Sequence, residues 1–186
     1  MPKRILIIDD RPTRPTLHLP AVVIEQLKQL PNVSLVSSID ESDYEAFDIL
    51  AIHRSYVISA KLSDRIDAFL QNNSKYLILF SGGISQSIVS EKGRKAILGS
   101  ESFYSSHLLP FCQELSECED VQLYKLLYGV ESWKLPLLLR LRHLCWIDPD
   151  NSDIDIEDEK DEIEDVLQMH SIDEVDKAIK QSIEVL

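Results

Sequence analysis

Apolar residues along the chain fall into two kinds of segment, short continuous runs and runs with helical spacing. The short runs are typical of buried strands and occupy residues 4–10, 47–55 and 75–83, and residues 33–39 alternate as a further strand does. Helical spacing covers residues 21–30 and 62–73, between these runs. Strands that alternate with helices and contain few polar residues predict a parallel sheet with helices on its faces.

The second half of the chain is mostly helical in pattern. Residues 95–100 indicate a fifth strand, and helical segments follow at 103–115, 121–129, 135–147 and 171–186. Ser171 and Glu174 are spaced as a capping box at the start of the last helix. We therefore predict an α/β fold, a five-stranded parallel sheet flanked by helices, with a C-terminal helical extension.

The distribution of charge divides the chain further. The net charge is −13, and residues 148–165 alone hold 11 acidic residues and one lysine. Residues 1–147 are nearly balanced, with 17 acidic and 16 basic residues. We expect an α/β domain at 1–115, a helical extension at 116–147, an acidic linker at 148–170 and an amphipathic helix at 171–186.

Composition argues against several classes of protein. Residues 1–147 are nearly balanced in charge and residues 148–165 are acidic, so the chain lacks the basic surface that binding of duplex nucleic acid requires. No apolar run approaches the roughly 18 residues of a membrane span, and the N-terminus has no signal-peptide pattern. The three cysteines have no paired spacing, which is typical of reduced thiols. We expect a cytoplasmic protein with a protein partner, and the oligomeric state stays open.

The carboxyl ends of the predicted strands carry polar residues, and ligands of open α/β sheets bind at that edge. The residues are Asp9, Asp10, His53, Arg54, Ser81, Gly82 and Gly83. The two aspartates are either ligands of a cation or capping carboxylates paired with Arg11, Arg14 or Arg54. The Ser-Gly-Gly segment either presents backbone amides to an anion or forms a simple turn.

The segment KRILIIDDRP resembles the first strand and acidic pair of two-component receiver domains, in which the pair binds Mg²⁺. The resemblance covers about residues 3–115 and implies a flavodoxin-like sheet. Ser81 matches the family's hydroxyl residue at the end of the fourth strand. His53 stands where the family has its phosphoacceptor aspartate, and the fifth strand lacks the family's lysine.

These departures imply a degenerate receiver that does not signal by phosphorylation. Phosphoryl transfer to an aspartate needs a carboxylate nucleophile beside a metal ion. We expect Arg54 to reach across to Asp9 or Asp10, so that a guanidinium replaces the cation. On this interpretation the protein needs no cofactor, whereas Mg²⁺ is the possible cofactor if Asp9 and Asp10 bind a cation.

A second, weaker resemblance covers residues 47–83. A strand, a helix that starts with Leu-Ser and a strand that ends in glycines are similar to the core of class I glutamine amidotransferase-like domains. The catalytic form of that family needs a cysteine in a tight turn after a strand. Cys112, Cys118 and Cys145 do not lie in such a motif. The resemblance therefore implies a shared architecture without the activity.

The leading interpretation is a non-enzymatic regulatory module of a bacterial-type system that works through protein contacts. Its expected contact residues are Arg54, Ile172, Val175, Ile179 and Ile183, together with the acidic segment. The alternative is a hydrolase-like enzyme that depends on a metal or an anion. In that case Asp9 and Asp10 hold the cation, His53 is the acid/base, and Ser81 with the two glycines holds the oxyanion.

Overall fold

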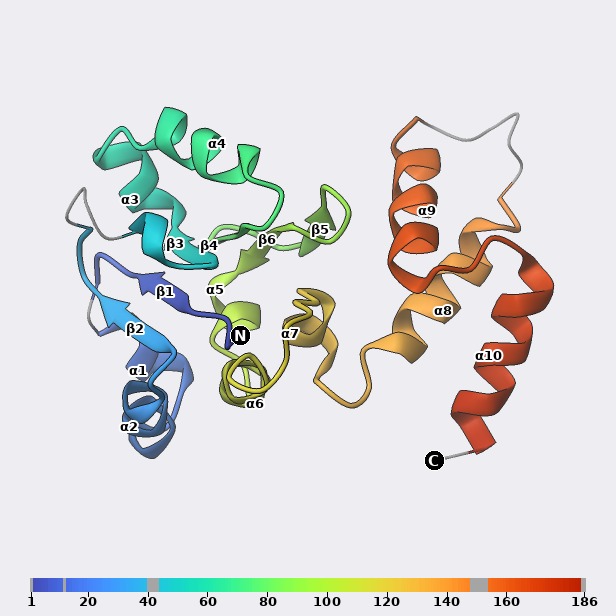
Figure 1. Ribbon diagram of the computed structural model, residues 1–186, viewed down its shortest axis with the longest axis horizontal. Helices are drawn as coiled ribbons and strands as arrows, with labels where there is room; N and C mark the ends of the chain where they lie inside the picture. The colour runs from blue at the N-terminus through green and yellow to red at the C-terminus, as the bar shows by residue number, and fades with distance from the viewer. Residues whose placement is uncertain (1, 12, 40–43, 148–153, 185–186) are drawn as a thin grey trace.

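The chain forms an α/β lobe and a helical lobe in the computed structural model, which describes residues 2–11, 13–39, 44–147 and 154–184 (Figure 1). Within these residues the α/β lobe contains a six-stranded sheet in the order β2-β1-β3-β4-β6-β5. The strands are β1 (Ile5–Ile8), β2 (Val33–Val36), β3 (Ile49–His53), β4 (Tyr76–Ser81), β5 (Ile88–Ser90) and β6 (Lys95–Gly99). The predicted α/β class, with a mostly parallel sheet between helices, is confirmed.

Strand β1 runs through the centre of this lobe. Ile5 and Ile7 enter the core on one face of the sheet, and Leu6 and Ile8 enter the core on the other face. This is the period of two that a strand buried on both faces requires. β1 and β3 pair in parallel up to Ile8 and Ile52, so the next residue of each strand lies at the same carboxyl edge.

Helices cover both faces of the sheet (Figure 1). The helices of one face are α1 (Arg14–His18), α2 (Ala21–Gln29), α5 (Ser100–Phe103), α6 (Leu108–Glu114) and α7 (Tyr124–Tyr128). The other face is covered by the 3-10 helix η1 (Tyr44–Ala46), α3 (Arg54–Ser59) and α4 (Ser63–Gln71). The predicted helices at 21–30 and 62–73 correspond to α2 and α4.

The sheet of the described residues has one strand more than the five predicted. The additional strand, β5, pairs antiparallel with β6 at the edge of the sheet. Its three residues are too short to show a periodicity, which is why the pattern missed it. The turn to β6 contains Glu91, Lys92 and Gly93 with positive φ angles of 55°, 58° and 76°. Residues 91–94 are therefore the turn of the β5–β6 hairpin.

The helical lobe consists of α8 (Lys134–Leu144), α9 (Ile154–Leu167) and α10 (Ile172–Glu184). Their apolar residues form a separate core, in which Leu141 of α8, Ile163 of α9 and Val175 of α10 are buried. The acidic linker predicted at 148–170 is corrected, because residues 154–167 form α9. Its apolar positions 163 and 166 pack into this core and hold the acidic segment in a helix. Residues 148–153 lie outside the described part of the chain.

Helix α10 begins as the capping box predicts, since the Glu174 N–H donates to Ser171 Oγ at 3.4 Å. Its apolar stripe covers the chain's own helices. Val175 and Ile179 are 1 % and 7 % exposed in the core of the helical lobe, whereas Ile183 is 58 % exposed. The expectation that the whole stripe contacts a partner is thus corrected for Val175 and Ile179.

The helices of the chain are short. The longest of those described, α9, has 14 residues. Within the described ranges, none is long and apolar enough to cross a membrane.

Candidate functional site

Two adjacent carboxylates, Asp9 and Asp10, follow β1 at the carboxyl edge of the sheet. Asp9 is only 2 % exposed, and its N–H donates to the Val36 carbonyl at 3.0 Å. That bond continues the β1–β2 ladder and fixes the backbone of Asp9. Asp10 is partly exposed. The pair therefore places one carboxylate inside the protein and the other at its rim.

Arg14 neutralises this pair from within the chain. It is the first residue of α1, and its side chain is buried. Its Nη1 donates to Asp9 Oδ1 and lies 3.4 Å from Asp10 Oδ1. The Arg14 N–H donates to the Arg11 carbonyl at 2.9 Å, in the turn that brings α1 back over the strand end. Of the alternatives weighed for the aspartates, the geometry favours carboxylates paired with an arginine.

Two further donors reach Asp9. The Tyr104 hydroxyl donates to Oδ2 at 2.8 Å, and the Arg11 N–H donates to Oδ1 at 3.0 Å. Burial raises the pKa of Tyr104, and the charge of Asp9 raises it further. The hydroxyl therefore keeps its proton and remains a donor to the carboxylate.

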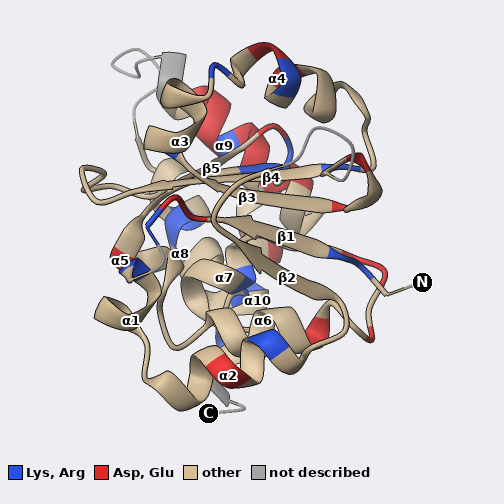
Figure 2. Ribbon diagram, turned by 90° about the vertical axis from the view of Figure 1, so that its left-hand side faces the viewer, with Lys and Arg blue, Asp and Glu red and all other residues tan. Residues whose placement is uncertain are grey.

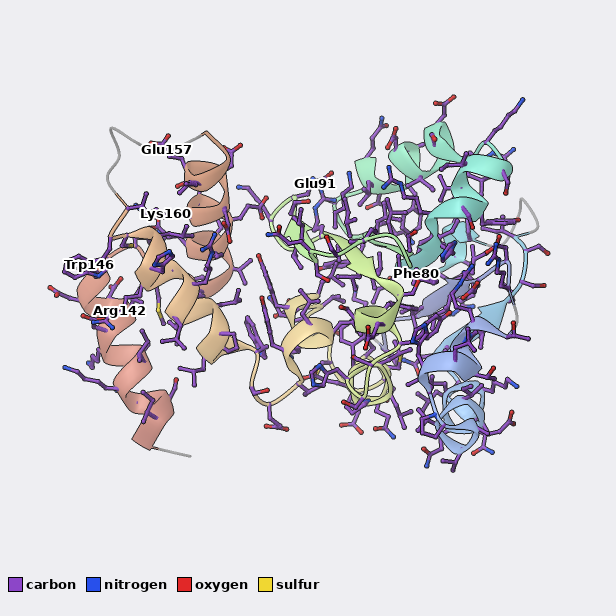
Figure 3. The ribbon with its side chains drawn as sticks, turned by 180° about the vertical axis from the view of Figure 1, so that it is seen from behind. Phe80, Glu91, Arg142, Trp146, Glu157 and Lys160 are labelled. Atoms are coloured by element: carbon purple, nitrogen blue, oxygen red, sulfur yellow. The ribbon has the colours of Figure 1, made fainter. Side chains whose placement is uncertain are left out.

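An aromatic group holds Tyr104 in place. Phe80 of β4 and Phe103 of α5 stack with ring centroids 4.2 Å apart. Tyr104 meets Phe80 edge-on at 5.4 Å. Phe80, labelled in Figure 3, lies inside the α/β lobe and belongs to its core. The tyrosine hydroxyl is thus positioned by rigid packing of rings.

His53 closes β3 and caps α3. Its Nδ1 accepts a hydrogen bond from the Ser55 N–H at 3.2 Å. Ser55 Oγ lies 2.6 Å from the same Nδ1 and 3.1 Å from Asp10 Oδ2. The imidazole Nδ1 also lies 3.7 Å from Asp10 Oδ1. His53, Ser55 and Asp10 therefore form one connected polar group.

The imidazole of His53 is neutral near pH 7. Burial lowers its pKa below the ordinary value of 6.5, and the charge of Arg14 lowers it further against the opposing effect of the two aspartates. A neutral ring whose Nδ1 accepts from the backbone carries its proton on Nε2. In this structure His53 is a helix cap at the position where the receiver resemblance places a phosphoacceptor.

Two of the predicted site features lie elsewhere. Arg54 begins α3 with its side chain exposed, and in the described residues it pairs with neither aspartate, so Arg14 has the role expected of Arg54. Gly82 and Gly83 lie in an exposed turn after β4. There Ser81 Oγ accepts from the Gly83 N–H at 3.5 Å, and both glycines have room for a side chain. The turn therefore does not require glycine.

The donors around Asp9 do not fit a divalent cation. Mg²⁺ needs carboxylate oxygens turned toward it, with no positive side chain between them. The oxygens of Asp9 already accept from Arg14, Tyr104 and the Arg11 N–H. In the part of the chain that the structure describes, no three His, Cys, Asp or Glu side chains are grouped to hold a metal. The residues present fit a pocket filled by a guanidinium.

Cys112 is a poor candidate for the nucleophile that the amidotransferase-like resemblance would need. Cys112 lies within α6 and is fully buried. Burial raises the pKa of its thiol to about 12, so the thiolate is absent near pH 7.

Three residues of the site were not singled out by the sequence patterns. Tyr104 and Ser55 were not predicted, and Arg14 was one of three arginines named. A tyrosine 95 positions from its carboxylate partner gives no local signal. Ser55 is the last residue of the run predicted as a strand, and the structure places it in the first turn of α3 instead.

Comparisons with protein-family models, with curated proteins and with solved structures find no match to this chain.

Proposed function

We propose that this protein is a receiver-like, flavodoxin-like module that works through contacts with a protein partner and transfers no phosphoryl group. The order of the five parallel strands supports the fold assignment. Read along the sheet it is β2-β1-β3-β4-β6, which corresponds to the flavodoxin-like order 2-1-3-4-5 when the antiparallel edge strand is set aside.

The contact of Arg14 with both aspartates carries the proposal. Asp9 and Asp10 lie at the strand end where the resemblance places a Mg²⁺ site, and Arg14 Nη1 interacts with both of them. A tethered guanidinium supplies the positive charge that a phosphorylation site takes from its metal. The module therefore needs no cofactor.

The neighbouring positions support the same conclusion. His53, at the acceptor position, is buried and neutral, and its Nδ1 caps α3. β6 ends in Gly99, and Ser100 follows it, so a lysine is missing from this strand end. Tyr104 donates instead to Asp9 from the same segment. The hydrolase-like alternative is less well supported, because Ser81 and the two glycines form an exposed turn of their own.

The remaining expectations belong to this proposal. The module acts in the cytoplasm as part of a bacterial-type regulatory system, and its partner is a protein. The C-terminal region is strongly acidic, whereas residues 1–147 are nearly balanced in charge. This distribution favours a partner protein with a basic surface and argues against duplex nucleic acid.

A titration with Mg²⁺ and acetyl phosphate tests the proposal. We expect the amide NMR signals of Asp10 and His53 to remain unchanged at millimolar Mg²⁺, with or without acetyl phosphate. The matched variant Arg14→Gln removes the guanidinium at similar volume and frees the carboxylates, so its signals should respond to Mg²⁺. A saturable response of the unmodified protein at these residues would overturn the proposal.

A further inference from the structure

A groove of about 770 Å³ separates the two lobes. Strand β5 and α7 form one side of it, and α8 and α9 form the other. Figure 1 shows the edge of the sheet pointing across this space toward α9, and Figure 3 shows Glu91 at the hairpin tip on the same side. The groove is thus lined by a sheet edge and by the most acidic helix of the chain.

The sheet edge in the groove has a free backbone position. The Leu77 N–H donates to the Arg94 carbonyl, and backbone groups of successive strand residues point to opposite sides. Ala96, two positions after Arg94, therefore directs its N–H and carbonyl toward β4. Val89 stands opposite Ala96 in the β5–β6 pair. Its N–H and carbonyl therefore point away from β6. In the described residues no further strand pairs with β5, which leaves these groups open to an added strand.

The opposite wall carries unbalanced negative charge. Glu162 Oε2 accepts from the Lys92 N–H at 2.5 Å, and Asp165 pairs with Lys92 Nζ at 3.1 Å. Asp158 and Asp161 are exposed on the same wall and have no basic partner in the described part of the chain. Figure 2 shows α9 as a mostly acidic helix. The groove therefore has spare carboxylates.

The floor of the groove is apolar and aromatic. Tyr124, Leu127 and Leu137 contribute to it, and Val89 of β5 packs against the cores of both lobes. Burial raises the pKa of Tyr124, and the charges of Glu162 and Glu159 raise it further. The negative potential of α9 thus extends to the floor, where aromatic rings suit a cation and its alkyl stem.

We propose that this groove binds an extended Lys- or Arg-rich segment of a protein partner, which adds as a strand along β5 and places its basic side chains against α9. Main-chain bonds to Val89 align the segment, and the acidic wall selects its side chains. The inference rests on the proposed function, because it names the surface through which the module meets its partner.

Another copy of the same chain is a poor occupant. Pairing of two β5 edges would bring two acidic helices together, and each chain already carries a net charge of −13. A basic segment has the complementary sign, and a volume near 770 Å³ admits several of its side chains.

The first test uses a peptide that alternates lysine with valine, added to the full chain, with a glutamate–valine peptide as its counterpart. We expect the basic peptide to bind and to slow hydrogen exchange of the Val89 amide about tenfold or more, because that amide gains an acceptor. The acidic peptide should not bind. Absence of binding by the basic peptide, or binding with unchanged exchange at Val89, would overturn the proposal.

Charge reversal locates the binding surface. The double variant Asp158→Lys with Asp161→Lys should weaken binding about tenfold or more, since attraction becomes repulsion. The matched control, Asp64→Lys with Asp67→Lys, makes the same change of charge on exposed positions of α4 and should bind as the unmodified protein does. Equal weakening in the two variants would show that only net charge matters and would overturn the site.

Alternate N-methylation of the peptide tests strand addition without altering the protein. Successive residues of a strand direct their N–H groups to opposite sides, so methylation of one set should abolish binding and methylation of the other should be tolerated. Equal affinity of the two methylated peptides would overturn the added strand. Spermine that binds as tightly as the peptide, or a β5-dependent dimer in sedimentation, would each overturn the peptide as the occupant.

These outcomes separate the two proposals. If the basic peptide does not bind, and the NMR signals of Asp10 and His53 do not respond to Mg²⁺ and acetyl phosphate, the inference is overturned and the proposed function is retained. If the amide NMR signals of Asp10 and His53 respond to Mg²⁺ with acetyl phosphate, the proposed function is overturned, whichever peptide the groove binds.

Discussion

The hydroxyl of Tyr104 donates a 2.8 Å hydrogen bond to Asp9, a carboxylate 95 positions earlier in the chain. The bond joins the segment after β6 to the end of β1 and lies in the buried part of the site. Because its acceptor is charged and shielded from water, loss of the donor leaves a carboxylate oxygen without compensation.

Tyr104→Phe should therefore lower the free energy of unfolding by about 2 kcal/mol, as expected for a hydrogen bond to a buried charged group. Urea denaturation followed by circular dichroism measures it. Tyr128→Phe is the control, because Tyr128 is 39 % exposed and its change should stay within about 0.5 kcal/mol. Equal losses in the two variants would contradict a special role for the Asp9 contact.

Arg14→Gln should destabilise the protein by about 3 kcal/mol, because it leaves the buried Asp9 charge without its ion-pair partner. The double variant with Asp9→Asn should recover part of this loss, since the uncompensated charge is also removed. A denaturation cycle over the four proteins measures the coupling. Arg11→Gln, at an exposed arginine, serves as the control, and additive losses for Arg14 and Asp9 would refute their coupling.

His53 should make the protein less stable as the pH falls. Its folded pKa is lowered, so below the unfolded value of 6.5 the unfolded chain binds a proton that the folded chain does not. This contribution to stability is complete above pH 6.5 and is lost as the pH falls toward the folded pKa.

His53→Asn retains a side chain able to cap α3 and should flatten the stability profile below pH 6.5, where the lowered pKa of His53 makes the folded chain bind fewer protons than the unfolded chain. Urea midpoints at several pH values give the profile. The unmodified protein, measured at the same pH values, is the reference. An unchanged slope in His53→Asn would mean that another group titrates in this range.

Ile179→Ala should destabilise the helical lobe by about 2 kcal/mol, at the lower end for a buried isoleucine. Ile183→Ala, one turn later in α10, should change stability by less than about 0.5 kcal/mol, because Ile183 is 58 % exposed. Thermal unfolding followed by circular dichroism distinguishes the two. Similar effects at both positions would contradict the burial of only one side of the stripe.

The architecture was largely predictable because its signals are local. Continuous apolar runs gave the parallel strands of the sheet, and the spacing of Ile66, Phe69 and Leu70 gave α4. β5 escaped prediction because three residues show no periodicity. α9 escaped because its many carboxylates obscured the few apolar positions, such as Ile163, that fix it against α8.

The site was predictable only in part. Asp9, Asp10 and His53 could be placed together, since parallel strands bring their carboxyl ends to one edge. The choice between Arg14 and Arg54 depends on side-chain direction. Arg54 follows β3 directly and points outward from the start of α3, whereas the turn at Arg11 carries Arg14 back over the carboxylates. Neither direction is encoded by spacing alone.

The buried pairing of Arg14 with Asp9 joins residues only five positions apart in one chain. Its effective concentration is therefore set by the fold, and a dissolved cation must compete with a counter-ion that cannot diffuse away. Because the pair is buried, added salt screens it little. The pairing of Arg14 with Asp9 consequently depends on the folded arrangement of the chain and only weakly on the ionic composition of the surroundings.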